Sequence, residues 1–218
     1  MKHRAFLLLM ILATLPFLSC TLIEVVSGSG EVITESRSIQ SADSIVLKGM
    51  GDLRVSQGNE TALVVVGEDN ILPFVKTRVE NGTLIIEVSG DNGPVVIMPT
   101  RQLRYTLTLQ SVRSVETLGS GNVEVSGNST RSVTLKSSGS GSIHLQAIDA
   151  DEVVAVMTGS GNIEAGGVSS SVRVASYGSG RALLSGLSAR EADVVLSGSG
   201  DAYLRVSDRL SAKSYGSG

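Results

Sequence analysis

The triplet Gly-Ser-Gly recurs at a nearly fixed interval and constrains the fold more than any other feature of the chain. From residue 119 to the C-terminus, successive triplets begin 18 to 20 residues apart. A fixed period of this length is typical of stacked repeat architectures, which present a long surface rather than one deep pocket. The triplets begin at Gly28, Gly119, Gly139, Gly159, Gly178, Gly198 and Gly216, and a Gly-Met-Gly variant begins at Gly49.

Two short alternating segments flank most triplets. Apolar residues stand four and six positions after the first glycine, as in Val123 and Val125 or Ile143 and Leu145, and a second apolar pair precedes it. Because alternation with a period of two marks a strand with one buried face, each repeat is predicted to be strand, turn, strand, turn. One unit cannot bury this face alone, so units stacked in parallel register are expected.

This pattern predicts an all-β fold, a parallel β-helix (a solenoid) with coils of about 20 residues. The glycines are expected at tight corners that need positive φ. Polar residues of the same corners are expected to bond to local backbone, and these are Ser29, Asn122, Asn162 and Asp201. Residues after position 21 show no sustained helical period.

The first 20 residues resemble a bacterial lipoprotein signal peptide. A basic start (Lys2–Arg4) precedes an apolar run (Ala5–Leu15) that is too short for an ordinary membrane span. Ser19 fits the position before a lipidated cysteine, and Phe17 stands where leucine is usual. We therefore expect export, with Cys20 as the lipid-modified first residue; an ordinary secretory signal is the alternative.

The charge of the chain excludes some partners. The formal net charge is −3, and without Lys2 and Arg4 it becomes −5. No basic run is present, so nucleic acid binding is disfavoured. The single cysteine excludes a disulfide within the chain. We expect no cofactor, and the sequence does not indicate an oligomeric state.

The repeat is interrupted between the markers at Gly49 and Gly119. Within this stretch, residues 75–88 predict a hairpin with an Asn81-Gly82 turn, and an insertion of this kind can cap an open solenoid end or form a lateral β layer. The predicted domains are a signal peptide (1–20), a linker (21–27) and a β-helix domain (28–218), with an irregular insertion (52–118) and regular coils (119–218). Since Gly216 opens a new coil, we expect the last coil to be truncated.

Several short motifs resemble the head GIN domain family of auto-transporter adhesins. They are Gly28-Ser29-Gly30, Ser44-Ile45-Val46-Leu47, Gly49-Met50-Gly51-Asp52, Val55-Ser56-Gln57-Gly58, Asp69-Asn70-Ile71-Leu72-Pro73, Asn81-Gly82-Thr83-Leu84 and the later Gly-Ser-Gly repeats. The resemblance covers residues 28–218 and implies an exported, often lipoprotein-like, right-handed β-helix. It brings no catalytic residues.

Candidate catalytic groups are few. Glu124 and Glu164 share one outward position of the repeat, with His144 on the unit between them. Two units separate the glutamates by ~9.6 Å, the upper limit for an inverting glycosidase pair, so we expect a solvated stripe. The carboxylates that follow the triplets are too sparse for Ca²⁺, which takes 6–8 oxygen ligands. No catalytic or metal site is predicted.

Three tyrosines, Tyr177, Tyr203 and Tyr215, are the speculative surface-binding residues. We expect a non-enzyme: an exported, lipid-anchored β-solenoid that presents an extended surface for adhesion or scaffolding in the cell envelope. Its expected partners are the membrane, through the lipid, and cell-surface glycans or envelope proteins. The alternative is an envelope protein that binds or cleaves polysaccharide, and a third possibility is a spacer that assembles through its strand ends.

Overall fold

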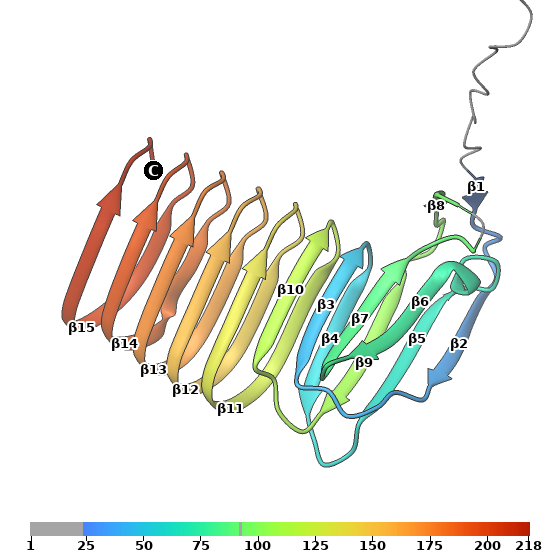
Figure 1. Cartoon of the computed structure of the whole chain (residues 1–218), viewed down its shortest axis with the longest axis horizontal. Helices are drawn as coiled ribbons and strands as arrows, with labels where there is room; N and C mark the ends of the chain where they lie inside the picture. The colour runs from blue at the N-terminus through green and yellow to red at the C-terminus, as the bar shows by residue number, and fades with distance from the viewer. Residues whose placement is uncertain (1–23, 92) are drawn as a thin grey trace, which may run out of the picture.

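The computed structural model describes residues 24–91 and 93–218, and in these residues the chain is built almost entirely of β-strands (Figure 1). A 13-stranded sheet holds most of them, and β1 and β8 form a separate two-stranded sheet. The elements are β1 (Glu24–Ser27), β2 (Val32–Arg37), β3 (Ser44–Gly49), β4 (Asp52–Gln57), β5 (Ala62–Glu68), the 3-10 helix η1 (Leu72–Phe74), β6 (Val75–Glu80), β7 (Thr83–Val88), β8 (Val95–Met98), β9 (Arg104–Leu109), β10 (Ser114–Gly119), β11 (Asn122–Ser137), β12 (Ile143–Met157), β13 (Ile163–Ser176), β14 (Ala182–Leu196) and β15 (Ala202–Ser214).

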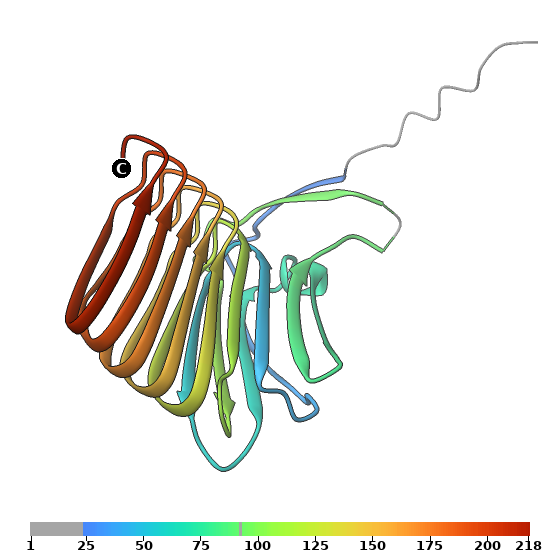
Figure 2. The ribbon, with the colours of Figure 1, turned by 60° about the vertical axis from the view of Figure 1, so that its left-hand side comes forward.

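The regular repeats pair in parallel, as their period predicts. β11 pairs with β12, β12 with β13, β13 with β14 and β14 with β15. Val123 stands opposite Ile143, which stands opposite Ile163, so like apolar residues stack on one another. Each of these strands bends midway, and its two halves lie in two facing layers (Figure 2).

The all-β part of the predicted fold class is confirmed, but the predicted right-handed parallel β-helix is wrong. The large sheet is mixed, because the pairs β2–β5, β5–β9 and β6–β7 are antiparallel, and it curls as one open half-barrel. The two short strands expected in each repeat are one continuous strand of 13–16 residues, since interstrand pairing persists through the bend. The sheet therefore folds over on itself instead of breaking at a corner.

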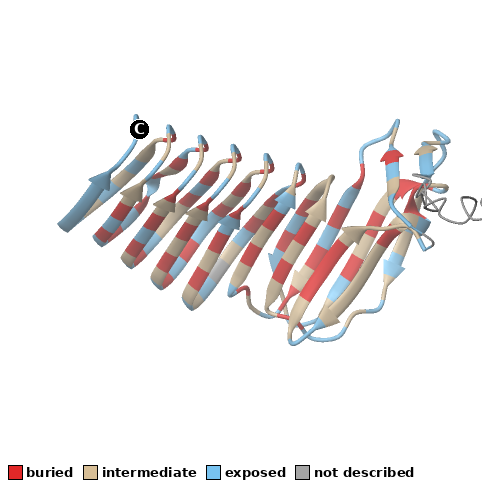
Figure 3. Ribbon diagram, turned by 45° about the horizontal axis from the view of Figure 1, so that its top comes forward, coloured by how far each residue is buried: buried red, intermediate tan, exposed pale blue. Residues whose placement is uncertain are grey.

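The core lies between the two layers and is aliphatic apart from Tyr105 and Met157 (Figure 3). The predicted inward positions of β11–β14 are buried; Val125, Leu145, Val153 and Ala155 have no exposed surface. On β15, the last strand, Leu210 and Ala212 are exposed. The first triplet departs from this rule. Val32, four residues after Gly28, is exposed because β2 pairs antiparallel with β5 and does not belong to the parallel stack.

The interruption of the repeat extends both layers. β10 and β11 stack directly on β3 and β4, which precede the insertion. On the other side of this unit, β7 pairs with β3 and β9 pairs with β4. The predicted hairpin is confirmed: β6 and β7 are antiparallel, and Asn81 and Gly82 both have positive φ, 50° and 75°. The insertion thus covers the N-terminal end of the stack.

The repeated glycines are required mainly because of close stacking. Gly49 and Gly119 adopt positive φ, as expected. Gly139, Gly159 and Gly178 do not, so the expected positive φ is wrong for these three glycines. A Cβ on Gly159 would instead lie 2.0 Å from the carbonyl oxygen of Gly139. The backbone N–H groups of Ser160 and Gly161 both donate to that oxygen, at 2.9 and 3.0 Å.

Polar side chains beside the triplets link neighbouring repeats. Asn122 Oδ1 accepts from the backbone N–H of Ser142 at 3.1 Å, and Asn162 Oδ1 accepts from that of Arg181 at 3.0 Å. These bonds cross to the next strand, so the expectation of local bonds is wrong for both asparagines. It is confirmed for Ser29, whose hydroxyl accepts from the N–H of Glu31 at 3.1 Å.

Candidate functional site

An outward row of side chains crosses the first halves of the repeat strands. Matched register places Arg54, Glu124, His144, Glu164, Leu183 and Tyr203 on successive strands from β4 to β15. We call these six residues the outer row. The expected stripe of Glu124, His144 and Glu164 is therefore confirmed, and Tyr203 joins it two strands beyond Glu164.

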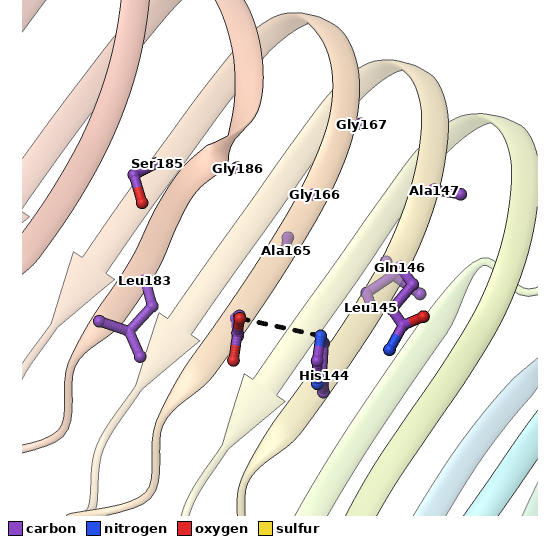
Figure 4. Close-up of a pocket in the computed structure, with 11 residues that line it drawn as sticks. His144, Leu145, Gln146, Ala147, Ala165, Gly166, Gly167, Leu183, Ser185 and Gly186 are labelled. Atoms are coloured by element: carbon purple, nitrogen blue, oxygen red, sulfur yellow. Dashed lines mark ion pairs between the residues drawn. The ribbon is translucent and has the colours of Figure 1, made fainter.

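Neighbouring charges in the outer row pair with one another. Arg54 Nε lies 3.5 Å from Glu124 Oε2, and His144 Nε2 lies 3.8 Å from Glu164 Oε1, the contact that Figure 4 marks with a dashed line. Gln146 donates to Glu124 at 3.4 Å. These side chains remain between about two-fifths and three-quarters exposed, so water screens the pairs and they contribute little to stability.

A shallow groove of about 340 Å³ lies beside the middle of the outer row (Figure 4). It is lined by His144, Gln146, Glu164, Leu183 and Ser185, and Leu145 with several alanines and glycines makes up the rest of the lining. The groove coincides with irregular pairing, since the register shifts between Leu145 and Ile148 on β12 and again after Glu164 on β13.

Small residues create the depth of this groove. Gly166 and Gly186 face one another across β13 and β14, and a Cβ on either would meet only ordinary contacts, at 3.6 and 3.5 Å. Ala147 and Gly167 both adopt positive φ, 53° and 129°. A Cβ on Gly167 would collide with the backbone of Ile148. Sequence reasoning missed the groove; its signal was the Gly166-Gly167 pair inside a predicted strand, which often marks a bulge.

The chemistry available in the groove is hydrogen bonding. The groove is lined by an imidazole, a carboxylate, an amide and a hydroxyl, together with the apolar side chain of Leu183. Glu124 interacts with Arg54 and Gln146, and Glu164 interacts with His144. The two glutamates therefore do not face one another as a catalytic carboxylate pair would. In the described ranges, 24–91 and 93–218, no group of three His, Cys, Asp or Glu residues could hold a metal ion.

The three speculative tyrosines are all exposed but do not form one patch. Tyr177 and Tyr215 each precede a triplet, and their backbone N–H groups donate to Met157 and Leu196 in the neighbouring strands. Tyr203 lies in the first half of β15, opposite Leu183, in the other layer. Only Tyr203 therefore lies near the groove residues.

A buried carboxylate that sequence reasoning missed fastens the N-terminal segment. Glu68 at the end of β5 is 1% exposed and accepts hydrogen bonds from the Thr100 hydroxyl (2.6 Å) and from the backbone N–H groups of Gly30 (2.7 Å), Thr100 (2.8 Å) and Arg101 (3.2 Å). The Thr100 hydroxyl and these N–H groups hold the pKa of Glu68 below its usual range. A saturated carboxylate of this kind has a structural role.

Cys20 and the rest of the signal sequence lie outside the described residues, so the lipid site remains a prediction. Within the described part of the chain, no helix is long and apolar enough to cross a membrane. The predicted domain boundaries likewise remain predictions.

The curled sheet and its exposed outer row define an all-β repeat protein with one long exposed face. Residues 42–218 match the family described as "Putative auto-transporter adhesin, head GIN domain". The match spans most of the chain, so the protein belongs to the head GIN domain family. This membership supports an adhesion-type, non-catalytic role and a place in the cell envelope.

Solved structures share the fold at low sequence identity. A Bacteroides fragilis protein described as a "putative adhesin" is 19% identical with a TM-score of 0.75, covering 88% of this chain and 97% of its own. A Parabacteroides distasonis protein described as a "putative lipid binding protein" is 21% identical with a TM-score of 0.72, covering 89% and 98%. A Parabacteroides merdae "putative adhesin" is 16% identical with a TM-score of 0.62, covering 89% and 97%. No curated protein matches the chain.

Proposed function

We propose that the protein is an exported, lipid-anchored adhesin of the cell envelope that binds glycans or other envelope polymers through the outer row and its groove. The observation that carries this proposal is the groove between His144 and Ser185, which polar side chains line together with Leu183 on an otherwise regular face. Sugars present hydroxyls and apolar C–H groups together, so a wall with both characters suits them.

The anchor follows from the sequence of the first 20 residues. A lipid on Cys20 would hold the sheet at the membrane and leave the outer row free to meet extracellular partners. Cys20→Ala is expected to abolish lipidation, which mass spectrometry of the mature N-terminus measures, and to release the protein from the membrane fraction. Normal membrane retention of this variant would overturn the anchor.

Binding of the purified protein to an array of glycans and envelope polymers tests the adhesin role. Gly186→Leu is expected to abolish binding, because its side chain fills the groove from a position where a Cβ has room. Ser56→Leu is the matched control, since it places the same side chain on β4, outside the groove. Equal binding by both variants would exclude the groove, and Tyr203→Ala would then test the end of the outer row.

A second candidate function is cleavage of a bound polysaccharide, favoured by the His144–Glu164 pair in the groove wall. Turnover assayed on every polymer that binds distinguishes the two functions. Product formation that disappears in Glu164→Gln would establish an enzyme, whereas binding without products supports the adhesin.

A further inference from the structure

The two-stranded sheet of β1 and β8, here called the arm, has one apolar face exposed to solvent. The arm is separate from the 13-stranded sheet and extends away from it (Figure 2). The pairing is parallel, with Val25 opposite Val96 and Ser27 opposite Met98. Because side chains alternate along a strand, these four residues share one face.

Large apolar side chains on this face are exposed to solvent, although apolar residues of a strand are usually buried. Val25, Val96 and Met98 are 61%, 48% and 58% exposed, whereas Ile97, on the opposite face, is only 5% exposed. A contiguous apolar cluster that a protein leaves in water commonly marks an interaction surface. The charged residues nearest in sequence, Glu24 and Asp91, are acidic and exposed. They would repel an acidic partner surface, so charge attraction to such a surface does not explain the cluster.

The arm is held firmly to the main sheet. Asn70 accepts from the backbone N–H of Ser29 at 2.9 Å and donates to the carbonyl oxygen of Ser27 at 2.7 Å. Glu68 binds the next residue, Gly30, and the segment that follows β8, through Thr100 and Arg101. The apolar face of the arm therefore has a fixed orientation relative to the outer row.

The position of the arm in the chain identifies its partner. Val25 is the fifth residue after Cys20, and an extended chain over these five steps spans at most about 18 Å. A lipid on Cys20 would therefore keep the apolar face within reach of the bilayer surface. We propose that Val25, Val96 and Met98 lie in the membrane interface and set the orientation of the domain; this proposal rests on the lipid anchoring proposed above.

The contact is apolar, so it depends on burial and not on lipid charge. Apolar side chains gain free energy on leaving water in proportion to the area buried. The backbone edges of the arm remain polar, which favours a place in the interface over the hydrocarbon core. The orientation is then expected to be the same in zwitterionic and anionic bilayers and insensitive to salt.

Depth-dependent fluorescence quenching tests the proposal on the lipidated mature protein in phosphatidylcholine vesicles that contain brominated phospholipid. A fluorophore on Met98→Cys should lose intensity, and the same fluorophore on Val168→Cys should not. Val168 is a matched control because it is 53% exposed, at the far bend of β13. Cys20 does not react with the fluorophore once it is lipidated.

Two failures remain distinguishable in this experiment. A protein that lacks the lipid by mass spectrometry and does not float with the vesicles would overturn the anchor itself. A protein that floats with the vesicles but shows equal intensity at both positions would overturn only the membrane contact of the arm. As a second measurement, Val25→Lys combined with Met98→Lys should keep flotation and remove the quenching of a fluorophore on Val96→Cys.

Discussion

Gly119 stands in register with Gly49, although 70 residues separate them in the sequence. The carbonyl oxygen of Gly49 accepts from the backbone N–H groups of Ser120 and Gly121, both at 2.8 Å. This is the same double contact that joins consecutive triplets later in the chain. The insertion therefore interrupts the repeat in sequence but not in space, and the triplet edge runs unbroken from β3 to β15.

Close contact along this edge predicts a severe effect of adding one methyl group. Gly159→Ala places a Cβ 2.0 Å from the carbonyl oxygen of Gly139, so the strands must separate. The expected destabilisation is ~1–3 kcal/mol, measured by urea unfolding followed by circular dichroism. Gly186→Ala is the control, since its Cβ meets nothing closer than 3.5 Å; equal stability of the two variants would contradict this account of the triplet.

The repeat period was sufficient to predict the register of β11–β15 and the inward rows of β11–β14, because stacking places equivalent residues on one another. The Asn81-Gly82 turn likewise identified its hairpin. The partners of β7 and β9 were not predictable, since pairing with β3 and β4 depends on contacts without a sequence period. The continuous bent strands were missed because small and polar residues at the bend look like a turn in sequence.

The candidate site was predictable in part for the same reason. Glu124, His144 and Glu164 were aligned by counting along the repeat, and the structure places them so. The groove beside them depends on register shifts at Leu145 and Glu164, which break the period. Glu68 and the residues that saturate it come from three separate segments, so no local pattern could identify its role.

A buried charge in the aliphatic core should unfold the stack. Ile143 is fully buried between Val123 and Ile163, and Ile143→Asp would place a carboxylate there without a partner. We expect Ile143→Asp to lose the cooperative thermal transition, and we expect the same result for Ile163→Asp. Ile143→Val, which removes one methylene, should cost only ~0.5–1.5 kcal/mol. An unchanged transition in Ile143→Asp would contradict the inward position of this residue.

The lowered pKa of Glu68 predicts a stability that depends on pH. A carboxyl group with a lower pKa in the folded than in the unfolded protein stabilises the fold above the unfolded value, about 4.3, and this contribution is lost as the pH falls through the folded pKa. Glu68→Gln should therefore be less stable than the wild type at pH 7, with a difference that narrows on acidification below pH ~4. Unfolding midpoints measured between neutral and acidic pH test this, and a difference that stays constant would contradict it.

One buried hydroxyl should be replaceable without cost. Thr117 on β10 is 1% exposed, and its Oγ1 has no hydrogen-bond partner. Its inward row contains Leu47 on one side and Ser137 on the other. Thr117→Val keeps the branched shape and removes a polar group that is costly to bury, so a gain of ~1 kcal/mol in unfolding free energy is expected. Thr134→Val on the solvent-facing row is the control and should change little; a loss of stability in Thr117→Val alone would mean that the hydroxyl is satisfied in solution.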